Sequence, residues 1–429
     1  MRPRSDSKAE RQLILLSAGT AARRRSARGD AARLAPAVDW PRLTATLYSR
    51  RLLPLLGPRI LDLLDEDPAR ADFAAAVARA RDAGRRQGQL LQLVTLRLLE
   101  LLAAAGIPAA ALKGPLLGEA IHGDPGRRLS SDLDLLVAPH RLADAVAVVR
   151  QLGYGEPIDH LLPDGLPLLH LRMLDHRRKL PPLELHWRVH WYERRFAADR
   201  LLPPTAGVWL APNATGAATP AATVRAVPAA TASTPAAAPA AGGPAPGWRP
   251  APADELASLL LFYARDGFID LRIATDISAW WDARGGELPA EGLAGVVDAY
   301  PQLARVLPAA ARVAENIVGL PAARLLRDAR RPGVRGRLAA KVANPNPQTS
   351  QPQLYADMGL VDGLLAPPGG LRDFVARQLL PPAEVLDQQA RHGERHGTRA
   401  VPVRFLGVLG RYGLTLTRRG LRRAPAAGA

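Results

Sequence analysis

The chain has 429 residues, 48% hydrophobic and 23% charged, which is enough for two or three domains with buried cores. No apolar stretch approaches the ~20 residues that span a bilayer, so a membrane span is not expected. The lack of cysteine excludes disulfides, thiolate metal sites and a cysteine nucleophile. Aromatic residues make up only 5%, which argues against a protein that stacks the bases of single-stranded nucleic acid.

The net charge of +17 is concentrated at the two ends of the chain. Residues 1–36 contain nine basic and three acidic side chains, residues 391–429 contain nine and one, and the rest sums to +3. Nucleic acid is therefore an alternative partner but not the favoured one. The apolar run at 13–16 is too short for a signal peptide and is followed by arginines. We expect residues 1–38 to be a disordered or helical leader on a cytoplasmic protein.

The spacing of apolar residues and the positions of glycine and proline predict the helices and strands of the first half of the chain. Leucines at helical spacing predict helices over 39–106, ending at Gly106. Further on, the pattern predicts strands at 109–112, 132–137, 168–174 and 183–189, and helices at 115–122 and 141–152. A charged turn at 175–179 is expected to join the last two strands.

The second half begins with a segment of different composition. Alanine and proline supply 26 of the 42 positions in 211–252, which is typical of a flexible linker. Beyond it, helices are predicted at 255–264, 271–282 and 303–318, a loop at 329–370, and a helical section from 371. The expected domains are 1–38 (leader), 39–200 (first helices and catalytic core), 201–252 (linker), 253–390 (helical domain) and 391–429 (basic tail).

Two acids on one predicted strand are the first candidate for chemistry. Strand alternation places Asp132 and Asp134 on one face and Leu133 in the core. Two such carboxylates repel each other unless a cation lies between them, and Mg²⁺ prefers oxygen ligands. The alternative interpretation is a pair of solvent-facing acids on an edge strand.

Two neighbouring motifs favour the metal interpretation. Gly114 precedes a short predicted helix whose first N–H groups can face a phosphate. On another predicted strand, alternation places Glu184 and His186 on one face. A third acid would complete a two-metal site for in-line displacement at phosphorus.

These motifs resemble a known family. The run Leu-Lys-Gly at 112–114, then Arg128 with Asp-Leu-Asp-Leu-Leu-Val at 132–137, then Glu-Leu-His-Trp at 184–187, is similar to the uncharacterised bacterial nucleotidyltransferases of the DNA polymerase beta-like superfamily. The resemblance covers roughly 40–325, with a fainter similarity at 371–386. It implies an α/β fold (α+β): a small mixed-sheet nucleotidyltransferase core flanked by N-terminal helices and a C-terminal helical domain.

The resemblance also implies roles for individual residues. Gly114 would form the phosphate-binding turn, Asp132 and Asp134 would be the paired metal ligands, and Glu184 would be the third acid. Two positions differ from the wider superfamily. Pro115 stands where a second Gly or a Ser is usual, which removes one N–H, and Glu184 stands where Asp is frequent.

The remaining candidates each have a structural alternative. Lys113 could neutralise a phosphate or point to solvent. Arg128 could bind phosphate oxygens through its planar fork or pair with a local acid. Ser130 and Ser131 could contact phosphate or only form a turn, and His186 could orient a ligand or make a structural hydrogen bond. Arg272 and Asp276, four residues apart on a predicted helix, are most simply a surface ion pair, and the tryptophans at 280–281 are expected in the core.

The function expected is transfer of a nucleoside monophosphate from an NTP such as ATP to an acceptor hydroxyl, with release of pyrophosphate. Mg²⁺ or Mn²⁺ would be the cofactor, and the acceptor would be a small molecule, a peptide or a protein. The alternative is a catalytically silent copy of the fold that acts as a regulatory or partner-binding protein. If the three acids repel one another, Asp134→Asn should leave stability unchanged or raise it by at most ~1–2 kcal/mol.

Overall fold

The computed structural model describes most of the chain, and several predicted segments lie outside it. The described residues are 8–159, 169–175, 180–205, 249–326, 333–343, 351–368 and six single positions between 370 and 410. The part of the predicted linker from 206 to 248, most of the turn at 175–179, most of the helical section from 371 and most of the basic tail lie outside these ranges. Among the described residues, no helix is both long and apolar enough to cross a membrane.

The amino-terminal region is helical from residue 8 onwards. Its helices are α1 (Lys8–Ser17), α2 (Ala21–Ser26), α3 (Arg28–Leu34), α4 (Trp40–Ser49), α5 (Leu53–Leu63) and α6 (Ala71–Ala104). Of the two forms expected for 1–38, the described part has the helical one, and Leu13 and Ile14 of α1 are fully buried in the main core. Those two apolar side chains anchor the basic segment to the folded body.

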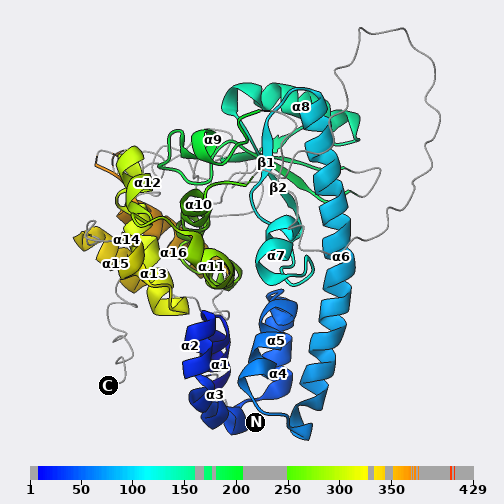
Figure 1. Ribbon diagram of the computed structural model, residues 1–429, viewed down its shortest axis with the longest axis vertical. Helices are drawn as coiled ribbons and strands as arrows, with labels where there is room; N and C mark the ends of the chain where they lie inside the picture. The colour runs from blue at the N-terminus through cyan, green and yellow to red at the C-terminus, as the bar shows by residue number, and fades with distance from the viewer. Residues whose placement is uncertain are drawn as a thin grey trace, which may run out of the picture.

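Helix α6 has 34 residues and runs along one side of the molecule, from the first helices to the sheet (Figure 1). Two of its glycines face the loop that leads into the second strand. A Cβ on Gly84 would lie 2.5 Å from the carbonyl oxygen of Gly126, and one on Gly88 would lie 2.6 Å from that of Pro125. The missing side chains let this loop lie directly against the helix backbone.

We expect Gly88→Ala to lower the free energy of unfolding by about 1–3 kcal/mol, because the methyl group would overlap the Pro125 carbonyl group. This cost should exceed the gain of about 1 kcal/mol from the higher helix propensity of alanine. Urea denaturation measures the difference. Gly29→Ala in α3 is the matched control, since its Cβ would meet only the Arg33 guanidinium at 3.8 Å and should not destabilise. Equal effects of the two substitutions would contradict the packing argument.

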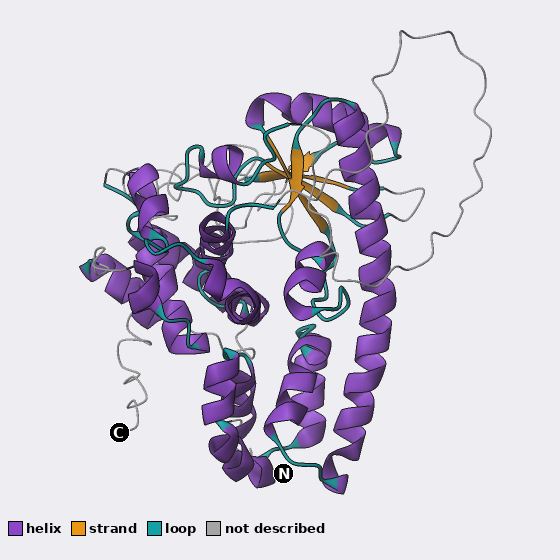
Figure 2. Cartoon of the chain, viewed as in Figure 1, coloured by secondary structure: helices purple, strands orange, loops and turns teal. Residues whose placement is uncertain are grey.

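Five short strands form one mixed sheet, as expected for the core (Figure 2). They are β1 (Ala109–Ala111), β2 (Leu133–Val137), β3 (Ile158–Asp159), β4 (His170–Met173) and β5 (Leu183–His186), in the order β1-β2-β5-β4-β3. Strands β2 and β5 are parallel, and the other neighbours are antiparallel. Three helices lie between or directly after the strands in the sequence: α7 (Pro115–His122), α8 (Leu142–Gln151) and α9 (Phe196–Arg200).

The two faces of this sheet have different chemistry because side chains alternate along a strand. On one face, Leu133, Leu135 and Leu185 join a small apolar core with leucines of α6 and with Val149 of α8. The opposite face carries Asp134, Leu136, Glu184 and His186. The apolar face fixes the register, and the register in turn places the polar side chains together.

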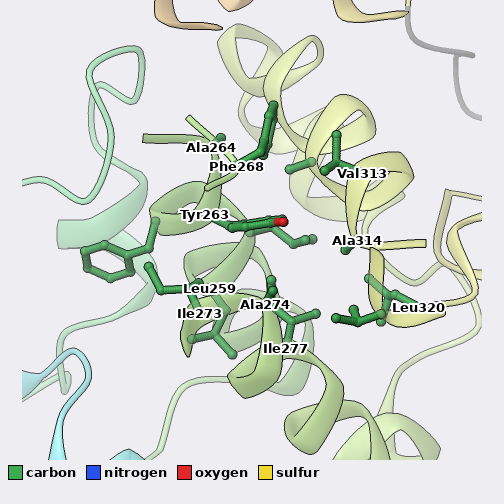
Figure 3. Packing of buried hydrophobic residues seen from close by; sticks show 14 of the residues in the cluster. Leu259, Tyr263, Ala264, Phe268, Ile273, Ala274, Ile277, Val313, Ala314 and Leu320 are labelled. Carbon is green, nitrogen blue, oxygen red and sulfur yellow. The ribbon is translucent and has the colours of Figure 1, made fainter. Parts of the chain in front are cut away.

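The carboxyl-terminal region is also helical. It contains α10 (Pro252–Arg265), α11 (Leu271–Arg284), α12 (Ala294–Ala299), α13 (Val306–Val318), α14 (Ala322–Leu326), α15 (Val334–Val342) and α16 (Gln351–Leu365). Tyr263 lies among apolar side chains of α10, α11 and α13 (Figure 3). Trp280 is fully buried, as expected. The predicted loop at 329–370 is wrong over α15 and α16, where Val361 and Leu365 are buried.

Candidate functional site

The parallel pairing of β2 with β5 brings two of the predicted acids together. Asp134 lies directly opposite Glu184, and Leu136 lies opposite His186. The His186 Nε2 atom is 3.0 Å from Asp134 Oδ1 and 3.4 Å from Glu184 Oε2. One imidazole therefore bridges two carboxylates that are 50 positions apart in the sequence.

Asp134 is a buried carboxylate with two cationic or hydrogen-bonding partners on the same oxygen. Lys113 Nζ lies 2.9 Å from Asp134 Oδ1, the atom that also contacts His186. Burial opposes ionisation, but Lys113 and His186 together hold the pKa of Asp134 well below its usual value. The other oxygen, Oδ2, is buried and has no hydrogen-bond partner among the described residues. It is the atom available to a cation.

Glu184 is held by histidines from two strands. Antiparallel pairing places His170 of β4 opposite His186, and His170 Nε2 lies 3.5 Å from Glu184 Oε2. Burial alone would raise the pKa of Glu184, but the hydrogen bond with His186 and the charges of Lys113 and His170 hold it at about 2. His170, Glu184 and His186 each offer a ligand atom within 4.8 Å of the other two. The three side chains are thus placed so that they could hold a metal ion.

Asp132 comes just before β2 and is half-buried. Burial and the charge of Asp134 raise its pKa, and Glu184 adds to the rise, whereas Lys113 and Arg272 oppose it. All three predicted acids therefore influence one another electrostatically. Asp132 is the one of the three acids whose pKa is raised, because burial and the neighbouring acids outweigh the nearby positive charges.

The turn before α7 has the expected form. Gly114 is the residue before the helix and has φ 84°, a conformation that favours glycine. Pro115 occupies the first helical position, as predicted. The buried Ser130 lies near Gly114, where a Cβ would be 3.8 Å from its hydroxyl oxygen, and Ser131 is exposed. The turn, β2 and Ser130 thus meet at one edge of the sheet.

Arg128 belongs to a different, buried group. Its guanidinium pairs with Asp276 of α11, whose other oxygen lies 3.0 Å from His122 Nε2. The interpretation of Asp276 as half of a surface pair with Arg272 is wrong: its side chain is 1% exposed, and Arg272 pairs with Asp270 at 2.9 Å. The group ties α11 to α7 and to the loop before β2.

Sequence reasoning missed a second cation beside the site. Arg265 of α10 stacks on Phe262, with its guanidinium carbon 4.7 Å from the ring centre, and Lys113 lies 5.5 Å from the same ring. Phe262 also contacts the His186 ring edge to face at 6.2 Å. Arg265 Nη1 is buried without a hydrogen-bond partner among the described residues. Nothing local in the sequence marks this arginine, because α10 approaches the sheet only in the folded chain.

Two buried titratable groups follow β5. Burial, assisted by the charge of Arg265, lowers the pKa of His190 to about 3. Burial raises the pKa of Glu193 to about 7, although its carboxylate accepts hydrogen bonds from the backbone N–H groups of Val189, His190 and Ala197. The two shifts affect stability in opposite directions.

We expect acid to unfold the protein partly through His190. Its stabilising contribution is complete above pH 6.5 and is lost as the pH falls toward 3, because only the unfolded chain binds the proton in that window. Glu193 contributes in the opposite sense, fully below pH 4.5 and no longer above about pH 7. The two effects offset each other between pH 6.5 and 4.5, so the loss of folding stability should appear below pH 4.5. His190→Gln should shift the acid midpoint, followed by circular dichroism, to lower pH; the exposed His140→Gln should not.

Comparison with known proteins bears on this geometry. A family model described as an uncharacterised nucleotidyltransferase matches residues 36–315. The match covers the sheet, all of the predicted site residues and most of the helices, and it supports a general nucleotidyltransferase function with an NTP as substrate. It confirms the family resemblance that the sequence motifs indicate. No curated protein and no solved structure matches the chain.

Proposed function

Because the chain belongs to this nucleotidyltransferase family, we propose that it transfers a nucleoside monophosphate from an NTP to a hydroxyl group. The acceptor oxygen forms a bond to the α-phosphorus while the bond to the β-phosphate bridging oxygen breaks, and pyrophosphate leaves. The observation that carries this proposal is the in-register pair Asp134 and Glu184, with the buried oxygen Asp134 Oδ2 free to accept a cation.

The donor set fits a hard divalent cation. Asp132, Asp134 Oδ2 and Glu184 supply carboxylate oxygens. The raised pKa of Asp132 reflects burial first and then repulsion by Asp134, and a cation would relieve that repulsion. When bound, Mg²⁺ or Mn²⁺ would polarise the α-phosphate and stabilise the attacking and leaving oxygens. Lys113 and His186 contact Asp134 through Oδ1, so Oδ2 would be the oxygen that holds the cation. Glu184 is the candidate to accept the proton of the acceptor hydroxyl.

The triphosphate would lie along the edge formed by Gly114, Ser130 and Ser131. Lys113 and Arg265 both provide positive charge near Phe262. Arg128 is engaged with Asp276, so we assign it to holding this edge in place rather than to phosphate binding.

We expect Arg265→Gln to weaken NTP binding by about 10- to 100-fold, the equivalent of one or two charge-assisted hydrogen bonds. Its buried Nη1 has no hydrogen-bond partner among the described residues and would donate to a phosphate oxygen. Binding of a fluorescent NTP analogue measures the effect. The control is Arg324→Gln, which removes an arginine that also stacks on an aromatic ring, Trp281, at 5.5 Å. Equal binding by the two variants would contradict the phosphate role.

The reaction itself is tested with NTPs labelled in the α-phosphate. The protein is incubated with each NTP, Mg²⁺ or Mn²⁺ and a cell extract, and the label is followed into an acceptor. Transfer that disappears with Asp132→Asn is the expected result. No transfer and no Mg²⁺-dependent NTP binding would overturn the proposal.

Two observations favour a second function. Lys113 already neutralises Asp134 at 2.9 Å, and Pro115 removes one N–H from the phosphate-binding turn. A catalytically silent protein that binds a partner would retain its fold with this internal ion pair and without a cation. Failure to bind Mg²⁺ and NTP, with an unchanged melting temperature in their presence, would favour this second function.

A further inference from the structure

The cluster of His170, Glu184 and His186 has a different ligand chemistry from the paired aspartates. Two of its three donors are imidazole nitrogens, which Mg²⁺ rarely takes but zinc and its neighbours bind readily. The three residues come from two adjacent strands, with His170 directly opposite His186 and Glu184 two positions earlier on the same face. The sheet register therefore builds this cluster, and no flexible loop contributes to it.

Two of the distances inside the cluster match those between ligands of one metal. Two ligands that are each ~2.1 Å from a tetrahedral zinc ion lie about 3.4 Å apart. The two histidine Nε2 atoms lie 3.4 and 3.5 Å from Glu184 Oε2. Ordinary N–H···O hydrogen bonds are shorter, at roughly 2.7–3.2 Å. The two contacts with Glu184 are thus longer than ordinary hydrogen bonds and have the spacing of ligands around one metal; on binding, His186 Nε2 would exchange its 3.0 Å contact with Asp134 Oδ1 for the metal.

Burial and charge also favour a cation at this place. His186 is fully buried, and the side chains of His170 and Glu184 are only 12% and 10% exposed, so the cluster is largely shielded from solvent. The ionised Glu184 lies beside Asp134, and the positive charge of Lys113 is already directed to Asp134. With neutral imidazoles, the carboxylates of Glu184 and Asp134 carry two negative charges opposite the single positive charge of Lys113, so a divalent cation would be attracted to the cluster.

We propose that His170, Glu184 and His186 form a site for a divalent transition metal of the zinc class, next to the magnesium site of the proposed reaction and with a different ligand set. Three protein ligands leave one position open, as in zinc sites that exchange a water molecule. Glu184 is the residue common to both sites. Binding at this site requires no nucleotide, so it can be tested independently of the proposed function.

The experiment uses the full-length protein after treatment with a chelator. Co²⁺ is titrated in the absence of NTP and the visible absorption of four- or five-coordinate Co²⁺ is followed, after which Zn²⁺ is added to displace it. The expected result is one Co²⁺ per chain, bound with nitrogen ligands and released by Zn²⁺. His170→Gln should weaken binding by about tenfold or more, since even residues outside the coordination sphere cost about 10- to 100-fold when replaced. The exposed His140→Gln is the matched control and should bind as the unmodified protein does.

Two further arms separate this site from the proposed reaction. Asp132→Asn should bind Co²⁺ normally while losing Mg²⁺-dependent NTP binding, because Asp132 is not a ligand of the histidine site. If His170→Gln fails to fold, the X-ray absorption spectrum of the unmodified zinc protein replaces it, and two imidazole ligands are expected. The absence of Co²⁺ absorption, equal Co²⁺ affinity of His170→Gln and His140→Gln, or a zinc spectrum without imidazole would each overturn the proposal, whatever the outcome with NTP.

Discussion

Asp134→Asn should abolish nucleotidyl transfer, with a fall of several orders of magnitude in turnover. Asparagine keeps the size and one oxygen of the side chain but loses the negative charge that would hold a cation through Oδ2. The same substitution should also destabilise the protein by about 1–3 kcal/mol, because the buried Lys113 loses its ionic partner. Labelled-NTP transfer and urea denaturation of the same preparation measure the two effects.

The expected loss of stability reverses the sign inferred from the sequence. Three repelling acids would gain from the removal of one charge, but Lys113 and His186 more than offset the repulsion at Asp134, whose pKa is held far below normal. A double variant, Asp134→Asn with Lys113→Met, should recover part of the stability while remaining inactive. If the turnover of the Asp134→Asn variant were within tenfold of that of the unmodified protein, Asp134 would not be catalytic.

The strands and the acidic face could be predicted because their signals are local. Alternation of Asp and Leu over 132–137 fixes which side chains enter the small core, and Gly114 with Pro115 determines the start of α7. The packing of the first helix and the existence of the helices after residue 333 could not be predicted in this way. Helix α1 is stabilised because Leu13 and Ile14 are buried in a core formed by residues far away in the sequence. Helices α15 and α16 form in a segment whose glycines and prolines suggest a loop.

The partners of the site residues were harder to predict, because each depends on how distant elements pack. His170 reaches Glu184 only through the antiparallel register of β4 with β5. Arg265 reaches the site only because α10 packs against the polar face of the sheet, with Phe262 beside His186. Arg272 and Asp276 have the spacing of a helical ion pair, yet burial of Asp276 selects Arg128, 148 residues away, as its partner. A sequence pattern indicates which side chains can pair, and the fold decides which of them do.

A large loss of stability is also expected when the Arg128–Asp276 ion pair is broken. Asp276→Asn should lower the free energy of unfolding by about 3–5 kcal/mol, because it leaves a buried guanidinium without a counter-charge. His122, which shares Asp276, would lose its partner as well. Denaturation in urea measures the loss. Asp270→Asn is the matched control on the same helix: its partner Arg272 has a side chain that is 32% exposed, so the cost should be clearly smaller.

A double variant then separates support of the fold from phosphate binding. Replacing both partners, Arg128→Met with Asp276→Leu, removes the two buried charges together and should restore most of the stability lost in Asp276→Asn. If Arg128 only holds α11 against the loop before β2, this variant should bind Mg²⁺ and NTP within a few-fold of the unmodified protein. If Arg128 instead contacts the triphosphate, the variant would be stable but its NTP affinity would fall at least tenfold. That outcome would show that Arg128 binds phosphate and that Asp276 orients its guanidinium group.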